Sequence, residues 1–229
     1  MRGRLWAIVP ATIAVALFGA APASAFWAEG GGYRSGAFGT VEVHGVPGEA
    51  ADLTVRQFAA SLTNPSAPGK VIVHDDVASV TPPPAGHGQG CAQVDDHTLS
   101  CTGVGLGGEP ISVDYLWVGL GDEADRVNVP ATSLPMWVFG STGGGDDRVV
   151  LRDLDGSSVY LGDGNDRLVL RGSQSGPVFP ESVNGGAGDD VLDVRNGNDD
   201  APRCDAGVDV LYADPGETGT DCETRVAPL

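Results

Sequence analysis

Residues 162–170 have the sequence GDGNDRLVL, and this stretch decides the fold because its pattern recurs along the second half of the chain. A glycine-rich turn is followed by an aspartate and then by apolar residues two and four places further on. Related stretches occupy residues 121–129 (GDEADRVNV), 143–151 (GGGDDRVVL), 186–194 (GAGDDVLDV) and 205–213 (DAGVDVLYA). This alternation is typical of a strand with one buried face. Each repeat therefore predicts a loop that leads into a short strand.

The spacing of the repeats predicts a solenoid. The key aspartates follow one another at steps of 22, 19, 24 and 19 residues, which fits one coil per repeat. A second short apolar run lies between repeats, at residues 137–139, 158–161 and 182–183, so each coil should contain two strands. We predict an all-β fold, a parallel β-roll or β-helix, with the Gly/Asp turns stacked along one edge at a strand spacing of about 4.8 Å.

Stacked acidic turns raise an electrostatic problem that a cation would solve. Two ionised carboxylates about 4.8 Å apart repel by roughly 3 to 4 kcal/mol at an effective dielectric constant of 20. Ca²⁺ accepts six to eight oxygen ligands, and glycine lets carbonyl oxygens point into a turn. We therefore predict Ca²⁺ between adjacent turns, with ligands from the loop residues Asp125, Gly143, Gly145, Asp147, Gly162, Gly164, Asp166, Gly186, Gly188, Asp190, Gly207 and Asp209.

The repeats resemble the RTX, or hemolysin-type, nonapeptide G-G-x-G-x-D-x-U-x, in which U is a large apolar residue, and residues 185–193 match it in full. This resemblance implies a parallel β-roll with Ca²⁺ between the loops of successive coils, held by the loop aspartates and backbone carbonyls. RTX blocks usually repeat every nine residues and load both edges of the roll, whereas only every second turn carries the motif here. We therefore predict one ladder of about three or four Ca²⁺ ions instead of two ladders. Glu123 and Asp205 also replace glycines of the motif in the first and last loops.

The two ends of the chain resemble those of short exported actinobacterial repeat proteins, at residues 204–214 with 221–223 and at 48–55 (GEAADLTV). That resemblance implies the same fold and ion but no shared activity. The first 25 residues have a basic start, an apolar run and a small-residue ending, Ala23-Ser24-Ala25, so we expect a signal peptide cleaved before Phe26 and a freely secreted product.

The remaining chain should divide into an N-terminal β region, residues 26–118, and the repeat region with its C-terminal disulfide cap, residues 119–229. Short strands are predicted in the first region at residues 40–44, 53–55, 71–74 and 111–118. They form either irregular early coils that cap the solenoid or a separate small β-sandwich.

Four cysteines in an exported chain predict two disulfides. Three connectivities are possible, and the local pairs Cys91 with Cys101 and Cys204 with Cys222 are the simplest. A metal-ligand set of cysteines is the alternative, but the spacings are not those of zinc sites and no histidine lies close by in the sequence.

The charge of the repeat region excludes nucleic acid as an expected partner. Residues 119–229 contain 21 Asp and Glu against 8 Arg and no Lys, and so carry 13 of the 18 net negative charges. Phosphate binding needs clustered Lys or Arg. An envelope component, a glycan or another protein remains as the partner, and the sequence does not choose among them.

The sequence contains neither of the catalytic motifs G-x-S-x-G and H-E-x-x-H. His74-Asp75-Asp76 has the chemistry of a base or a metal ligand, but charged residues after a strand usually form a solvated turn, and His44, His87 and His97 are scattered. We therefore expect a binding or scaffold protein that folds with calcium, not an enzyme. The alternatives are a calcium-stabilised fragment of a secreted hydrolase or toxin, and a metal-free solenoid whose loops are remnants of a repeat.

Overall fold

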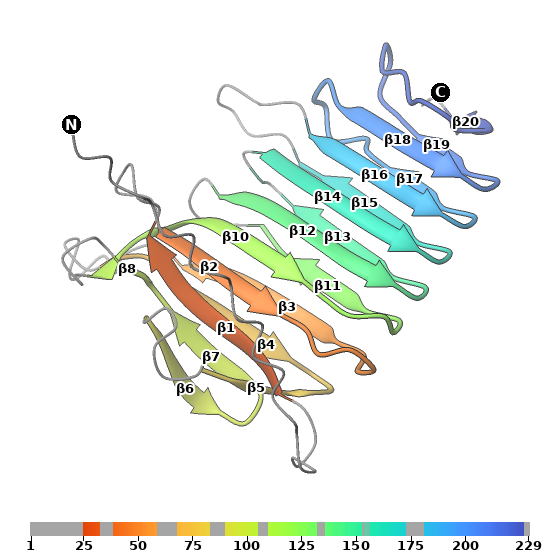
Figure 1. The fold of residues 1–229 in the computed structure, drawn as a ribbon. Helices are drawn as coiled ribbons and strands as arrows, with labels where there is room; N and C mark the ends of the chain where they lie inside the picture. Colours follow the sequence, from red (N-terminus) through yellow and green to blue (C-terminus); the bar gives the residue numbers. More distant parts are fainter. Residues whose placement is uncertain are drawn as a thin grey trace, which may run out of the picture.

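The chain is an all-β parallel solenoid in the computed structural model, which describes residues 25–32, 39–58, 68–82, 90–104, 110–131, 136–152, 154, 156–172 and 181–226. Strands stack along one axis in two layers (Figure 1). The predicted fold class is confirmed. Within the described ranges there is no helix, and hence none long and apolar enough to cross a membrane. The expected signal peptide, apart from Ala25, lies outside these ranges.

The first layer, sheet I, has the strand order β18-β16-β14-β12-β10-β2-β1-β5. Its members from β2 to β18 run parallel to one another and supply one strand of each coil. The bounds are β1 (Ala25–Gly32), β2 (Gly39–His44), β5 (Ser79–Thr81), β10 (Val113–Gly119), β12 (Trp137–Gly144), β14 (Gly156–Asp163), β16 (Ser182–Ala187) and β18 (Ala201–Ala206).

The second layer, sheet II, has the order β20-β19-β17-β15-β13-β11-β3-β4-β7-β6. It supplies the other strand of each coil. The bounds are β3 (Asp52–Phe58), β4 (Lys70–Asp75), β6 (Cys91–Asp95), β7 (Thr98–Cys101), β11 (Arg126–Val129), β13 (Arg148–Arg152), β15 (Arg167–Arg171), β17 (Val191–Asp193), β19 (Val210–Tyr212) and β20 (Thr224–Val226). A separate small pair is formed by β8 (Gly103–Val104) and β9 (Pro110–Ile111).

The N-terminal end of the stack has a different strand pattern from the repeat coils. β2 and β3 pair in parallel with β10 and β11 and so form a coil in line with the repeats. Beyond them β1 pairs antiparallel with β2, and β4, β7 and β6 continue sheet II antiparallel. Both sheets thus extend into residues 26–118, and β10 spans the boundary expected after Val118.

The core between the sheets is built from stacked aliphatic side chains. The residue two places after each loop aspartate is buried and lies in register with its counterparts on neighbouring coils, so that one apolar column runs along the solenoid. The column consists of Val127, Val149, Leu168, Leu192 and Leu211. Burying a side chain of this size contributes about 1.5 to 3 kcal/mol, which explains why the period-two pattern sets the register.

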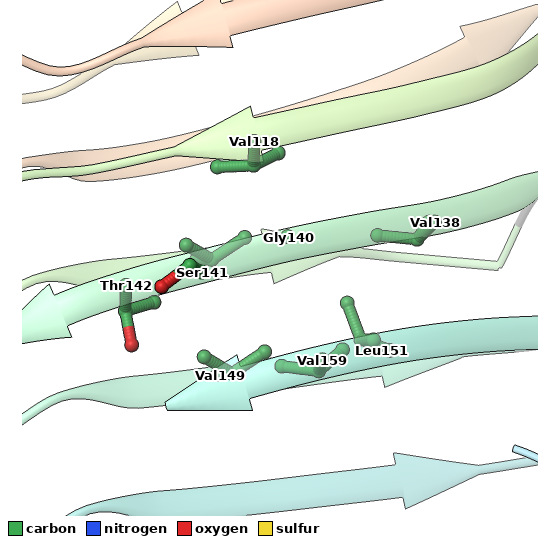
Figure 2. Close-up of a pocket in the computed structure, with 9 residues that line it drawn as sticks. Val118, Val138, Gly140, Ser141, Thr142, Val149, Leu151 and Val159 are labelled. Carbon is green, nitrogen blue, oxygen red and sulfur yellow. The ribbon is translucent and has the colours of Figure 1, made fainter. Parts of the chain in front are cut away.

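A gap in this packing is too small to serve as a ligand pocket. Figure 2 shows Val118, Val138, Val149, Leu151 and Val159 turned into the space between the sheets, and the cavity that they line measures about 20 Å³. A single water needs roughly 10 to 15 Å³. Most of the surrounding side chains are aliphatic, with Ser141 and Thr142 beside them, so this cavity is a packing irregularity of the core.

Both local cysteine pairs are disulfides, as predicted. Cys91 and Cys101 join β6 to β7, and Cys204 of β18 joins Cys222, just after the point where Thr220 pairs with Arg203. No free cysteine occurs among the described residues. The second bond therefore ties the C-terminal segment to the last coil of sheet I.

Replacing Cys204 and Cys222 together by alanine should destabilise the protein by about 3 kcal/mol, because the unfolded chain loses an 18-residue constraint. Urea unfolding followed by circular dichroism measures this. The Cys91→Ala, Cys101→Ala double variant is the matched control. It should leave the C-terminal coils as protected from hydrogen exchange as in the wild type, because coils of a solenoid contact only their neighbours. Equal loss of C-terminal protection in both variants would contradict this assignment.

Candidate functional site

The five loop aspartates lie one above another along one edge of the solenoid. Each immediately precedes a strand of sheet II, and the first residues of those strands, Arg126, Arg148, Arg167, Val191 and Val210, are aligned from coil to coil. The turns that carry them follow the same edge in Figure 1. All five side chains are buried, and we call them the aspartate ladder: Asp125, Asp147, Asp166, Asp190 and Asp209.

One carboxylate oxygen of each rung is used to connect the coils. The Oδ1 atom of each aspartate accepts a hydrogen bond from the backbone N–H of the preceding rung, at 2.8 to 2.9 Å. At the N-terminal end, Asp125 Oδ1 accepts the N–H of Ala51 at 2.7 Å. At the other end, the N–H of Asp209 donates to Glu223 Oε2 at 2.8 Å. The ladder is therefore continuous from the β2–β3 coil to the C-terminal segment.

The second carboxylate oxygen of each rung is buried without a hydrogen-bond partner among the described residues. Burial, together with the neighbouring carboxylates, raises the pKa of Asp125 to about 7 and that of Asp166 to about 7. Burial likewise raises the pKa of Asp190 to about 6, and it raises the pKa of Asp147 and Asp209. Buried unpaired oxygens are costly, so the five rungs need to be neutralised, either by protons on the carboxyl groups or by a bound cation.

Glycines next to the ladder let backbone carbonyls approach the next coil. Gly162 has a φ of 121°, and a Cβ at that position would collide with the carbonyl oxygen of Gly143. Gly164 stands in the same relation to the carbonyl of Gly145. The same close approach to the preceding coil recurs at Gly143, Gly145, Gly186, Gly188 and Gly207. Each interval between coils is thus flanked by carboxylate and carbonyl oxygens.

The last loop departs from this pattern as its sequence does. Asp205 is aligned with Gly186 and adopts a φ of 67°, a conformation that aspartate tolerates better than most residues. Its carboxylate is bound by Arg203 at 3.3 Å. The loop shape is therefore kept without glycine.

The oxygen set of the ladder fits a hard cation. Carboxylate and carbonyl oxygens are the ligands that Ca²⁺ prefers, and the unpartnered Oδ2 atoms are free to bind one. Across the described residues, no three His, Cys, Asp or Glu side chains form a ready-made metal cluster. Each interval offers two carboxylates, so most ligands in such a site would be backbone carbonyls.

A second column of buried acids lies on the opposite edge, and the sequence analysis missed it. Asp200 Oδ1 accepts the N–H of Glu181 at 3.1 Å, and Glu217 Oε1 accepts the N–H of Asp200 at 2.9 Å. Asn196 also donates to Glu181 at 2.7 Å. Burial, with the neighbouring carboxylates, raises the pKa of Glu181 to about 8 and that of Asp200 to about 6. The turn NGNDD at 196–200 was the available signal.

His74 lies on the outer face of sheet II, away from both columns. Its Nδ1 is 2.8 Å from Thr98 Oγ1 and its Nε2 is 3.2 Å from Asp76 Oδ1. Asp75 points the other way, is fully buried and accepts the N–H groups of Val77 and Ala78, so it holds the turn after β4. Thr54, Arg56 and Ile72 complete the lining of a surface depression around His74.

The other histidines form no common site with His74. His97 faces the backbone, with Nδ1 2.8 Å from the Ala78 carbonyl, and His44 packs against Trp117. His87 lies outside the described residues.

Fold and ladder together define the class of the molecule: a parallel β-solenoid with a buried column of acidic turns. No family model, curated protein or solved structure matches the chain. The atoms of the ladder themselves therefore indicate which ligand it could bind.

Proposed function

We propose that this protein is a secreted, calcium-binding repeat protein whose aspartate ladder holds Ca²⁺ between successive coils. The observation that carries the proposal is the column of five buried Oδ2 atoms without hydrogen-bond partners. Neighbouring rungs at the strand spacing of about 4.8 Å repel by roughly 3 to 4 kcal/mol if both are ionised at an effective dielectric constant of 20. A cation between rungs would turn that repulsion into attraction.

Calcium suits the ladder better than magnesium. Ca²⁺ accepts flexible arrangements of six to eight oxygens, whereas Mg²⁺ demands an octahedron and keeps several waters. The ligands would be the aspartates of adjacent rungs together with carbonyl oxygens of the glycine turns. Four intervals separate the five rungs, and the middle ones have the complete turn chemistry, which supports about three or four ions.

The proposed role is that of a scaffold or binding module at or outside the cell surface. The leader-like first 25 residues favour export, and extracellular calcium is abundant enough for sites of about 10⁻⁴ to 10⁻³ M. Ion binding would then be coupled to folding, because the ladder exists only when the coils are stacked. The resemblance of the turns to RTX repeats also supports calcium binding, on the basis of the motif alone.

The decisive experiment replaces both Asp147 and Asp166 by asparagine. Asparagine keeps an acceptor for the backbone N–H bonds but removes two buried charges. In metal-stripped buffer the variant should melt at or above the wild-type temperature, because the repulsion between rungs is gone. With calcium at 100 times the dissociation constant each wild-type site adds about 2.7 kcal/mol, and the variant should lose the sites that use these rungs.

Calorimetric titration gives the number of ions, and thermal melts with and without calcium give the stabilisation. Asp163→Asn is the control for loss of a surface charge, because Asp163 is exposed in the same turn as Asp166; it removes one charge, against two in the double variant. The proposal would be wrong if the wild-type protein took up no calcium and had the same melting temperature with and without calcium. The protein would then be a metal-free solenoid.

A hydrolase remains the second candidate because of one observation, the chain from Thr98 through His74 to Asp76. Its Asp76 side chain is 66% exposed, and solvent screening weakens the activation of a hydroxyl there. A fluorophosphonate probe tests this candidate directly. Labelling that disappears in both Thr98→Val and His74→Ala would establish it, and no labelling would leave binding as the function.

A further inference from the structure

Aromatic side chains gather on the outer face of sheet I instead of in the core. Among the described residues the buried core contains no Phe, Tyr or Trp, although such residues usually supply much of a core. Five aromatic residues lie on three neighbouring strands of sheet I, and we call them the aromatic platform: Tyr115 and Trp117 on β10, Trp137 and Phe139 on β12, and Tyr160 on β14.

Strand register places these side chains side by side and outward. Leu116 and Val118, which alternate with Trp117 along β10, are buried, so Trp117 points to the outside. Tyr115 is aligned with Trp137, and Trp117 with Phe139. Trp117 and Tyr160 are 38% and 49% exposed. Tyr115, Trp137 and Phe139 are half-buried, so solvent reaches the platform chiefly at Trp117 and Tyr160.

The two tryptophan rings lie low over glycines of the sheet. A Cβ built at Gly156 would come within 2.7 to 3.1 Å of three ring atoms of Trp137, which crosses from the neighbouring strand. A Cβ at Gly119 would collide with the six-membered ring of Trp117. The absence of a side chain at these two positions lets each indole settle against the backbone.

The rings of β12 and β10 also share an orientation. The Trp137 and Phe139 planes differ by 8° with centroids 6.2 Å apart, and those of Tyr115 and Phe139 differ by 23° at 6.0 Å. Nearly parallel rings that lie low on a sheet present a broad, shallow face. Side-chain anchors of a protein partner need pockets to fill, so this shape favours a flat ligand.

Charge narrows the class of ligand further. The strands that carry or flank the platform, β2, β10, β12 and β14, contain no Lys or Arg, and the chain has a net charge of −18. Its field repels polyanions such as nucleic acids and acidic glycans. Six of the eight arginines of the repeat region lie on strands of sheet II, Arg126, Arg148 and Arg167 among them, and Arg203 lies on β18, two strands beyond β14. Uncharged and cationic ligands remain after this step, and the polar groups around the platform distinguish between them.

Polar groups at the border of the platform match the hydroxyls of a sugar. Glu42 is aligned with Trp117 on the adjacent strand, and its Oε2 lies 3.4 Å from His44 Nε2. The His44 ring lies 4.9 Å from that of Trp117. On the other side Ser158 is aligned with Phe139. A pyranose ring offers C–H groups to the negative face of an indole and hydroxyls to such neighbours.

We propose that the aromatic platform binds an uncharged polysaccharide, with sugar rings stacked on Trp117 and Trp137. The chain of sugars would extend from strand to strand along the solenoid axis. This proposal is independent of calcium, since the platform faces outward on sheet I and the aspartate ladder is buried along an edge.

Binding is tested by depletion of the protein from solution on cellulose, chitin and insoluble β-1,3-glucan, in calcium throughout. At least one of these should retain the wild type, and Trp117→Ala and Trp137→Ala should each weaken retention about tenfold or more, as loss of a stacked tryptophan does elsewhere. Trp137→Phe should keep most of the affinity. Tyr212→Ala is the matched control, because Tyr212 lies on sheet II under Arg195.

Intrinsic tryptophan fluorescence with soluble hydroxyethylcellulose supplies a readout that needs no variant, and circular dichroism checks that each variant is folded. No retention on any of the three solids overturns the proposal, as does retention that both alanine variants preserve. A platform that instead joins two copies of the chain would appear as a dimer in sedimentation that Trp117→Ala dissociates, without polysaccharide binding. Failure of calcium binding alone would leave this inference standing.

Discussion

Replacing Gly162 by alanine should destabilise the protein by about 3 to 5 kcal/mol, a large part of the stability of a typical domain. Two costs combine at this position. The backbone has a φ of 121°, where a side chain is strained by about 1 to 3 kcal/mol. The new Cβ would also collide with the Gly143 carbonyl, which adds an overpacking cost of about 1 to 3 kcal/mol.

Gly216→Ala separates the two costs. Gly216 has a φ of 101°, but a Cβ there would meet nothing within 4 Å. This control should lose only the conformational part, about 1 to 3 kcal/mol. Urea unfolding of both variants in metal-stripped buffer gives the difference. Equal destabilisation at the two sites would mean that neighbouring coils are further apart at the ladder than described.

The calcium-free protein should lose stability as the pH rises from about 4 to 8, and calcium should reverse that trend. The sign follows from carboxyl groups whose pKa is higher in the folded chain than the ordinary value near 4. Such groups favour folding fully below their unfolded pKa, and the benefit is lost as the pH rises through the folded pKa. They are Asp190 and Asp200 at about 6, Asp125 and Asp166 at about 7, and Glu181 at about 8.

Asp193 acts in the opposite direction. Burial opposes its ionisation, but hydrogen bonds from Arg195 and Arg171 prevail and lower its pKa. Its contribution to stability is therefore lost only in acid, below the window in which the ladder titrates. Between pH 5 and 8 the raised groups decide the trend.

The proposed calcium sites change the expected outcome, because only the ionised ladder would bind the ion. Metal affinity rises as the ligands lose their protons, so the melting temperature in calcium should stay level or rise from pH 5 to 8 while it falls in metal-stripped buffer. Thermal melts at four pH values in each buffer test this. Identical profiles in both buffers would show that protons, not calcium, neutralise the ladder.

Glu181→Gln isolates the opposite edge in the same experiment. Because Glu181 carries the highest of these pKa values, about 8, its loss should flatten the calcium-free profile between pH 7 and 9. Asp163→Asn, an exposed change of the same charge, should leave the profile unchanged.

The solenoid itself was predictable because its signal is local. A glycine turn, an aspartate and two alternating apolar residues fix a loop and a strand within nine residues, and a step of 19 to 24 residues can stack them in only one way. Val127, Val149 and Leu168 illustrate this, since the same period-two pattern that identified each strand also sets its register in the core. The two disulfides were equally local.

Other elements gave no such signal. β18 runs through Ala201–Ala206 and contains a proline and an arginine, so it lacks the apolar run that predicted the corresponding strands of earlier coils. It pairs with the edge that β16 presents. β3 lies beside β11 in sheet II, although residues 59–125, which include several strands, separate the two in the sequence. Each of these strands pairs with a sheet edge that other parts of the chain form. A short stretch of sequence therefore does not reveal the pairing.

By itself the sequence determined the coil, the turn and the line of aspartates, because each depends on contacts with the same position one repeat later. Only the tertiary structure decided which unrelated residues meet. Glu181, Asp200 and Glu217 share no motif, and Trp117, Trp137 and Tyr160 share none either, yet parallel pairing of strands from coil to coil brings each set to one edge or one face. The physical reason is that burial of the core side chains sets the register between strands. Once the register is set, the residues that point outward are aligned as well, whatever their sequence.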